Sequence, residues 1–344
     1  VVELWTGRDV EGVIRPQQPD LEQPGYQVTL RPAMATDRVT FVGDLVAVVV
    51  AEDRYVAEDA AELVEVDYDI LPAVFDVDSA TATGAPLLHD GARDNVLFEA
   101  NFASPGFDET FARADLVVED TFTSGRLAAL SIEPRGCLAL YDAGRDALTF
   151  YSSTQIPHMA RTALAELLDW DERNIRVIAP DVGGGFGMKA YLYPEETIAA
   201  ALARHLRAPI KWVGDRREDL LTSTQCRDYR YQVASAFARD GTLLAIRADI
   251  ACNIGAYATM PFGCSAEAGG AAIYLPGPYR LKHYRFRTRA IATNTCPTGV
   301  YRGVAAPAAF FATEALMDRA AQTLGLDPAE LRRRNLLQPA EFPY

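Results

Sequence analysis

The chain has 344 residues and a formal net charge of −14 at pH 7. This acidity, with no basic run and no aromatic stacking platform, argues against nucleic acid as a partner. No stretch reaches the roughly 18 apolar residues of a membrane helix, and the N-terminus shows no signal peptide, so we expect a cytoplasmic protein without a membrane span. The length suggests two or three domains. Five scattered cysteines without a Cys-x-x-Cys spacing indicate reduced thiols.

The first 75 residues predict a small α/β domain. Residues 38–51 predict a hairpin whose second strand is buried on both faces. A helix follows at 55–63, with Asp53 as its N-cap. Residues 64–69 alternate between apolar and acidic side chains, which predicts a half-exposed strand. This strand–helix–strand order is typical of a small α/β unit.

A second, larger domain is predicted over 106–344, after a linker at 76–105 whose Asp, Ser, Thr, Gly and Pro residues are typical of a surface loop. Strand patterns occur at 116–123, 137–141, 147–153, 174–178, 209–213, 230–237, 243–251 and 281–291, and helix patterns at 107–114, 158–168, 195–207, 308–324 and from 327 onward. The mixed-charge run at 215–219 is interpreted as a solvated loop, and 259–279 as an irregular loop. The predicted fold class is therefore mixed α/β, or α+β.

A glycine-rich loop separates the predicted strand at 174–178 from the predicted helix at 195–207. Its sequence over 181–189 is Asp-Val-Gly-Gly-Gly-Phe-Gly-Met-Lys. Glycines at a strand-to-helix junction let backbone N–H groups approach a ligand closely. The spacing fits neither a P-loop nor a dinucleotide fingerprint. The pattern alone leaves two interpretations open, a ligand-binding loop or a tight turn without a ligand, and Phe186 is expected to pack against the core or a ligand.

Three further motifs accompany this loop in a fixed order. They are Ser-Thr-Gln at 153–155 before it, Tyr-Arg-Gly at 301–303 after it, and Leu-Asp-Pro-Ala-Glu at 326–330. Together the four motifs resemble the molybdopterin-binding large subunits of the molybdenum hydroxylases, the group of xanthine dehydrogenase, aldehyde oxidase and aerobic carbon monoxide dehydrogenase. The resemblance spans essentially the whole chain. It implies a hammerhead-like α/β domain at 1–75, incomplete at its N-terminus, and the first molybdopterin-binding domain at 106–344.

The resemblance also implies the residues of a cofactor site, namely Gln155, Gly184, Gly185, Phe186, Gly187, Arg302 and Gly303. In that family the glutamine that matches Gln155 hydrogen-bonds an oxo ligand of molybdenum, and the loop that carries Arg302 lines the cofactor. We therefore predict that Gln155, the Phe186–Gly187 pair and Arg302 converge in space, although about 150 residues separate the first from the last. No protein ligand of a metal is identified. Glu133 is interpreted as an ordinary loop carboxylate.

Several positions depart from the family pattern. Carbon monoxide dehydrogenases have Cys after the loop arginine, and this chain has Gly303, which disfavours carbon monoxide oxidation. Purine-oxidising relatives have Glu where this chain has Ala190, which disfavours purines. The family's catalytic base is a glutamate farther downstream that neither Glu195 nor Glu196 matches. No catalytic residue is therefore identified, and we expect this chain alone to be inactive.

The resemblance implies an oxidoreductase that hydroxylates or oxidises a small aldehyde or N-heterocycle with water. Its implied cofactor is molybdopterin, in the cytosine dinucleotide form. The implied partners are an iron–sulfur subunit, an FAD subunit and the remainder of the large subunit, assembled as a dimer of heterotrimers. Iron–sulfur clusters are expected on the partner because the cysteines here lack cluster spacing. The alternative left open is a cofactor-free remnant that acts as an assembly or interaction module.

Overall fold

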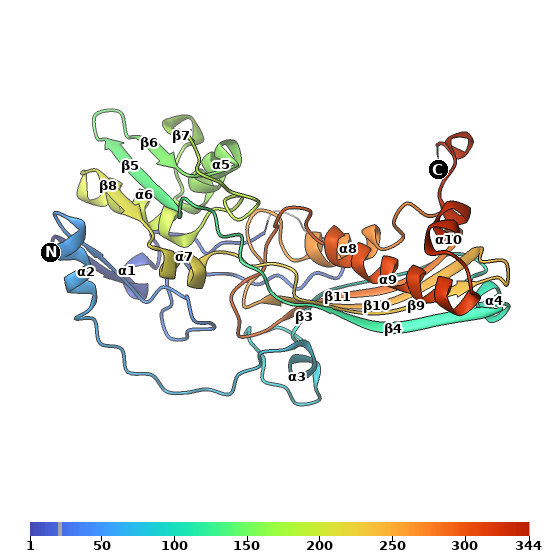
Figure 1. Ribbon diagram of the computed structural model, residues 1–344. Coiled ribbons are helices and arrows are strands. Elements are labelled where there is room, and N and C mark those ends of the chain that lie inside the picture. Colours follow the sequence, from blue (N-terminus) through green and yellow to red (C-terminus); the bar gives the residue numbers. More distant parts are fainter. Residues whose placement is uncertain (20–22, 344) are drawn as a thin grey trace.

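The computed structural model describes residues 1–19 and 23–343 and has an elongated shape with two lobes (Figure 1). The strands are β1 (Glu3–Thr6), β2 (Ala47–Val50), β3 (Val96–Ala103), β4 (Leu116–Ser124), β5 (Gly136–Asp142), β6 (Ala147–Ser152), β7 (Ile175–Ile178), β8 (Ile210–Val213), β9 (Tyr229–Phe237), β10 (Leu243–Gly255) and β11 (His283–Ala292). The α-helices are α1 (Gly7–Val10), α2 (Arg54–Ala61), α3 (Val77–Thr81), α4 (Phe107–Ala112), α5 (Pro157–Leu167), α6 (Pro194–Leu206), α7 (Arg216–Thr222), α8 (Ser265–Tyr274), α9 (Ala306–Leu324) and α10 (Pro328–Asn335). Short 3-10 turns lie at Glu172–Asn174 and Pro339–Glu341.

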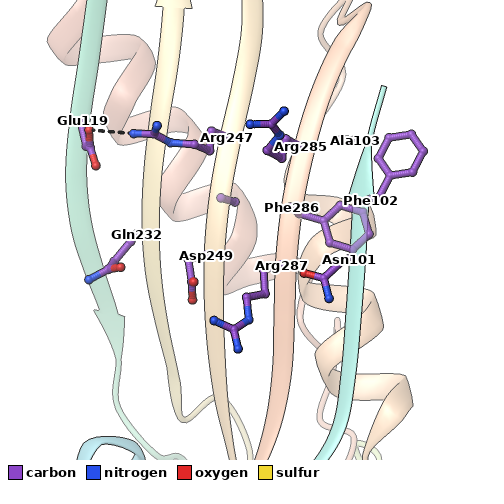
Figure 2. Close-up of a pocket in the computed structure, with 11 residues that line it drawn as sticks. Asn101, Phe102, Ala103, Glu119, Gln232, Arg247, Asp249, Arg285, Phe286 and Arg287 are labelled. Carbon is purple, nitrogen blue, oxygen red and sulfur yellow. Dashed lines mark hydrogen bonds and ion pairs between the residues drawn. The ribbon is translucent and has the colours of Figure 1, made fainter. Parts of the chain in front are cut away.

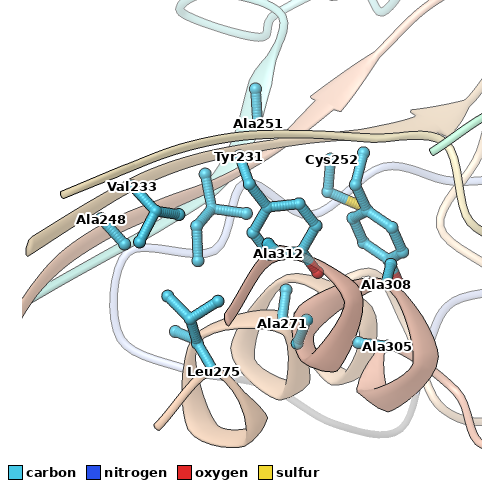
Figure 3. Close-up of a cluster of buried hydrophobic side chains, with 14 of the residues drawn as sticks. Tyr231, Val233, Ala248, Ala251, Cys252, Ala271, Leu275, Ala305, Ala308 and Ala312 are labelled. Carbon is cyan, nitrogen blue, oxygen red and sulfur yellow. The ribbon is translucent and has the colours of Figure 1, made fainter. Parts of the chain in front are cut away.

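The larger lobe is built on a five-stranded sheet in the order β3-β11-β10-β9-β4. The strands pair antiparallel, except that β10 and β11 run parallel. Helix α8 packs on β3, β10 and β11, and α9 packs on β4 and β9, so both helices cover the same face (Figures 1 and 3). Their inward side chains are small, chiefly Ala271 on α8 and Ala308 and Ala312 on α9. Small side chains let the helices lie close to the sheet.

The opposite face of this sheet carries charged side chains in alternation with the buried ones. A hollow of about 590 Å³ lies there, lined by Asn101, Phe102, Ala103, Glu119, Gln232, Arg247, Ala248, Asp249, Arg285, Phe286 and Arg287 (Figure 2). Each arginine pairs with a carboxylate on another element: Arg247 on β10 reaches across β9 to Glu119 on β4, Arg285 pairs with Asp108, and Arg287 with Glu99. The face is therefore balanced in charge, and it contains none of the residues predicted for a cofactor site.

The smaller lobe combines a four-stranded sheet, β7-β6-β5-β8, with helices α5 and α6. Its core includes Phe150, Leu164 and Ile198, all 1% exposed or less. The N-terminal pair β1–β2 joins this core, since Trp5 and Met34 belong to the same buried cluster. The predicted 1–75 domain therefore shares its core with residues that lie far along the chain.

The mixed α/β class is confirmed, and several local predictions are corrected. The interval 76–105 is not a linker over its whole length, because it contains α3 and the sheet strand β3, which pairs with β11. The predicted strand at 64–69 is not a strand, because the described residues offer it no partner. Helix α7 includes most of the run at 215–219, and α8 lies inside 259–279. Among the described residues, no helix is long and apolar enough to cross a membrane.

Candidate functional site

The glycine loop lies at the junction of the two lobes. It connects β7 to α6 in the smaller lobe, and the 300–303 segment that faces it connects β11 to α9 in the larger lobe. An ideal Cβ on Gly187 would lie 2.3 Å from the carbonyl oxygen of Val300. Only glycine fits this approach, because its φ is +105° and a side chain there would collide with backbone. The two lobes therefore meet along the loop.

Gln155 is fastened to the glycine loop by its side chain and its main chain. Its Oε1 accepts a hydrogen bond of 2.9 Å from the backbone N–H of Gly187. Its backbone N–H donates to the carbonyl of Lys189 at 2.9 Å. Among the described residues no acceptor is bonded to its Nε2, and the side chain is exposed. The amide is thus oriented with its donor free for a ligand.

The backbone conformation of the glycine loop leaves several N–H groups without an acceptor among the described residues. Gly184 and Gly187 have φ of +98° and +105°, and Phe186 between them has +56°. In the part of the chain that the structure describes, no acceptor is bonded to the N–H of Gly184, Gly185 or Phe186. Neighbouring N–H groups in a turn of alternating hand form a concave site for an anion. A Cβ on Gly185 would lie 2.3 Å from Gln155 Oε1, so a side chain there would displace the Gln155 amide.

Phe186 was expected to pack against the core or a ligand, and of these two the structure excludes the core. Its side chain is 45% exposed, with one ring edge near Gly184, where a Cβ would lie 3.1 Å from the ring. A phenylalanine at positive φ is uncommon and costs conformational energy. The half-exposed ring therefore lies beside the glycine loop and not in the protein core.

Arg302 reaches the glycine loop through its main chain. Its N–H donates to the carbonyl of Phe186 at 2.9 Å, and its own carbonyl accepts from Arg227 Nη2 at 2.6 Å. The Arg227 guanidinium also lies over the ring of Tyr301, 4.8 Å from its centre. Arg302 and Gly303 are exposed. The structure therefore brings Gln155, Phe186, Gly187 and Arg302 together, as the sequence predicted.

A buried ionic cluster lies beneath the loop and was missed in the sequence. Arg135 directly precedes β5 and is 3% exposed. It pairs with Glu195 at 3.0 Å and with Asp219 at 3.5 Å. Its guanidinium stacks on Tyr193, 3.7 Å from the ring centre. Burial alone would raise the pKa of Glu195, but the charge and hydrogen bonds of Arg135 outweigh it, so the pKa is lowered. Glu195 is therefore a structural anion that keeps α6 in place, and Asp219 explains why 215–219 is not a solvated loop.

Three other acids are also held by specific contacts. Glu196 caps α6 through the N–H of Tyr193 and accepts from Ser152 Oγ. Glu133 is not an ordinary loop carboxylate, because it accepts from the N–H of Gly183 at 2.6 Å and from Lys189 Nζ at 2.7 Å. Glu267 on α8 is 3% exposed and accepts from the hydroxyl of Tyr229. Burial raises the pKa of Glu267 to about 7.

The donor set fits an organic anion better than a metal ion held by side chains. Among the described residues, no group of three or more His, Cys, Asp or Glu side chains could hold a metal ion. The loop offers instead three open N–H groups and the free amide nitrogen of Gln155. Backbone and amide N–H donors of this kind suit phosphate or oxo groups.

Comparison with known proteins agrees with the geometry. Residues 88–336 match the family model of the molybdopterin cofactor-binding domain, and residues 1–72 match that of the aldehyde oxidase and xanthine dehydrogenase a/b hammerhead domain. The nicotine 6-hydroxylase large subunit of Paenarthrobacter nicotinovorans is 35% identical over 342 residues, which cover 99% of this chain and 42% of that protein. The carbon monoxide dehydrogenase large chain of Afipia carboxidovorans is 36% identical over 90% of this chain and 40% of that protein.

A solved structure shows the same likeness in three dimensions. Quinoline 2-oxidoreductase from Pseudomonas putida 86 has a TM-score of 0.95 and 37% identity over 99% of this chain and 43% of that chain. The chain thus spans about two fifths of the length of the relatives described here. The family match covers more than half of the chain and includes the glycine loop, Gln155 and Arg302. The chain therefore belongs to the molybdenum hydroxylase family, among its molybdopterin-binding large subunits.

Proposed function

We propose that this chain forms the part of a molybdenum hydroxylase large subunit that holds the molybdopterin cofactor, in an enzyme that oxidises a small N-heterocycle or aldehyde with water. The observation that supports this most directly is the convergence of Gln155, Phe186–Gly187 and Arg302 across the two lobes. The open N–H groups at Gly184, Gly185 and Phe186 would receive the oxygen atoms of the anionic cofactor. The free Nε2 of Gln155 would donate to its oxo group.

When bound, the cofactor supplies a metal centre that takes two electrons from the substrate carbon while water provides the oxygen atom. The residues of this chain contribute position and hydrogen bonds. Gln155 orients its donor because Gly187 holds its other amide atom. Phe186 covers the edge of the loop and reduces the access of water. Glu195 and Glu196 contribute no proton transfer in this proposal, because each is fixed in the core by other groups.

The local geometry supports the substrate classes that the sequence favoured. Gly303 has a φ of +95°, and a Cβ there would lie 2.9 Å from Pro307 Cγ. A cysteine at this position would therefore be strained, which argues against a carbon monoxide dehydrogenase site of the kind described above. Ala190 is 7% exposed and leaves no carboxylate for a purine. The names of two relatives, nicotine 6-hydroxylase and quinoline 2-oxidoreductase, favour an N-heterocyclic substrate.

The remaining elements of the proposal follow from the family. The cofactor is proposed in its cytosine dinucleotide form. Electrons would pass to an iron–sulfur subunit and an FAD subunit, in a cytoplasmic dimer of heterotrimers. The remainder of a longer large subunit would supply the catalytic glutamate and cover the loop, so residues 1–344 alone would be inactive.

Two variants at Phe186 test the proposed site in the full-length subunit. Asn and Asp both tolerate positive φ better than Phe does, so Phe186→Asn serves as a control for Phe186→Asp. The added charge would face an anionic cofactor and weaken its binding by about 1–3 kcal/mol, or roughly 5- to 150-fold in affinity. Molybdenum content and turnover of the purified protein are measured together. Wild-type molybdenum and activity in Phe186→Asp would refute the assignment, and a wild-type subunit without molybdenum would favour the interaction module.

A further inference from the structure

One carboxylate oxygen ties together the two ends of the glycine loop. Glu133 Oε2 accepts from the N–H of Gly183 at 2.6 Å and from Lys189 Nζ at 2.7 Å. Gly183 precedes the open N–H groups, and Lys189 follows them. The Glu133 N–H also donates to the Gly183 carbonyl at 3.1 Å. The five residues between these ends are thus closed into a ring by contacts with a segment about 50 positions earlier in the chain.

Lys189 extends this connection to the amide of Gln155. Its side chain is 1% exposed, and within the described residues Glu133 is the acceptor of its ammonium group. Its carbonyl accepts from the Gln155 N–H at 2.9 Å and from Thr154 Oγ1 at 3.3 Å. A movement of Lys189 would therefore displace Gln155 and its free donor. Lys189 therefore contacts Glu133 through its side chain and Gln155 through its carbonyl.

The segment that carries Glu133 is itself held in place. Arg216 Nη2 donates to the carbonyls of Ser131 and Ile132 at 2.6 and 2.8 Å. A Cβ on Gly183 would lie 2.6 Å from Glu133 Cβ, so the two backbones are in direct contact. The Glu133 carboxylate is about one third exposed, and the Lys189 ammonium and Gly183 N–H lower its pKa despite the opposing effect of burial. It is therefore ionised at neutral pH.

We propose that Glu133 and Lys189 form a positioning pair that holds residues 184–187 in their open, donor-presenting conformation and sets the rate at which the cofactor is lost. The proposal rests on the proposed function. It makes neither residue catalytic, because neither donates to the ligand. Removal of an ordinary ion pair would lower only the stability of the fold. A positioning pair would also speed cofactor loss in protein that remains folded.

The test uses four variants of the full-length subunit. Glu133→Gln keeps an acceptor oxygen for Gly183 but removes the charge, and Glu133→Ala removes both. Lys189→Met removes only the ammonium, and the double variant Glu133→Ala/Lys189→Met removes the pair. Glu172→Gln is the matched control, because Glu172 forms an exposed ion pair with Arg161 at 2.9 Å and contacts neither Glu133 nor Lys189 among the described residues.

Three quantities are measured well below the unfolding temperature of every variant: molybdenum per subunit, the rate of molybdenum loss under a competing chelator, and far-UV circular dichroism. We expect Glu133→Ala and Lys189→Met to lose molybdenum about tenfold faster than wild type, as for one lost hydrogen bond. The rate of molybdenum loss from Glu133→Gln should lie between the rates of these two variants and the wild-type rate. The rate for Glu172→Gln should equal that of wild type. The double variant should be no faster than Glu133→Ala, because both changes remove the same contact.

Each contrary result overturns the proposal. Wild-type loss rates in both Glu133→Ala and Lys189→Met would show an ordinary ion pair. Additive effects in the double variant would show that the residues act separately. If one variant fails to fold, the other and Glu133→Gln still decide the question. A wild-type subunit that carries no molybdenum would instead refute the proposed function itself, and the positioning role with it, before any variant is compared.

Discussion

Replacement of Gly187 by alanine tests whether the two lobes depend on the close approach at the glycine loop. The new methyl group would lie 2.3 Å from the Val300 carbonyl oxygen and 3.2 Å from Tyr301 Cα, at a φ of +105°. The positive φ costs about 1–2 kcal/mol, and the forced shift of packed backbone costs about 1–3 kcal/mol more. We therefore expect Gly187→Ala to lower the free energy of unfolding by about 2–5 kcal/mol.

Gly84→Ala isolates the first of these costs. Gly84 also has a positive φ, +80°, but nothing lies within 4 Å of its ideal Cβ. Urea unfolding of both variants and wild type, followed by circular dichroism, gives the two losses if the dependence on urea is unchanged. Gly187→Ala should lose about 1–3 kcal/mol more than Gly84→Ala. Losses that agree within about 0.5 kcal/mol would refute the collision with Val300.

Arg135→Met leaves the buried carboxylates of Glu195 and Asp219 without this guanidinium, and loss of one partner from a buried ion pair costs about 3–5 kcal/mol. The loss should shrink toward pH 4, because burial without Arg135 raises the pKa of Glu195 and this acid then takes up a proton. A loss below about 1 kcal/mol at pH 7 would contradict the buried-pair assignment. Glu267 has a pKa raised by burial from 4.5 to about 7, so the folded state keeps a proton that the unfolded chain releases, and stability falls as pH rises through that window. Because one pKa unit corresponds to 1.36 kcal/mol, Glu267→Gln should remove this pH dependence and raise the free energy of unfolding by up to roughly 3 kcal/mol at pH 8. An unchanged pH profile of the unfolding midpoint would show that Glu267 is ionised in the folded state.

The sequence predicted the elements whose patterns are local. Helix α6 has Pro194 at its first position and an alanine-rich interior, and it forms close to where expected. Long apolar strands such as β10, in which Arg247 and Asp249 alternate with buried residues, pair over most of their length. The order of the motifs identified Gln155, the glycine loop and Arg302, and these residues meet in the fold.

The missed elements depend on distant partners. Strand β3 lies in a region rich in turn residues, and it becomes a strand because Leu97 and Phe98 are buried where it pairs with β11. Helix α8 contains Gly269 and Gly270, which disfavour an isolated helix, but its alanines pack on the sheet.

The site residues that were missed share the same cause. In the sequence Glu133 resembles any loop acid, because its partner Lys189 lies 56 positions later. One signal was available in the sequence. Lys189 directly follows an apolar, glycine-rich stretch, and an ammonium group that is buried in such a setting requires an anion. Such a residue predicts a carboxylate partner but not its position in the chain.

The route of residues 65–73 between the lobes has a consequence for proteolysis. Within the described residues no hydrogen bond joins this backbone to any other group, and Ile70 is 96% exposed. A protease would cut here first, because a substrate strand must be free to extend into the enzyme's cleft. The cut would not release the N-terminal piece, because Trp5 and Met34 remain packed with α5 and α6. The nicked protein should therefore migrate as one species in its native state and as two in denaturant.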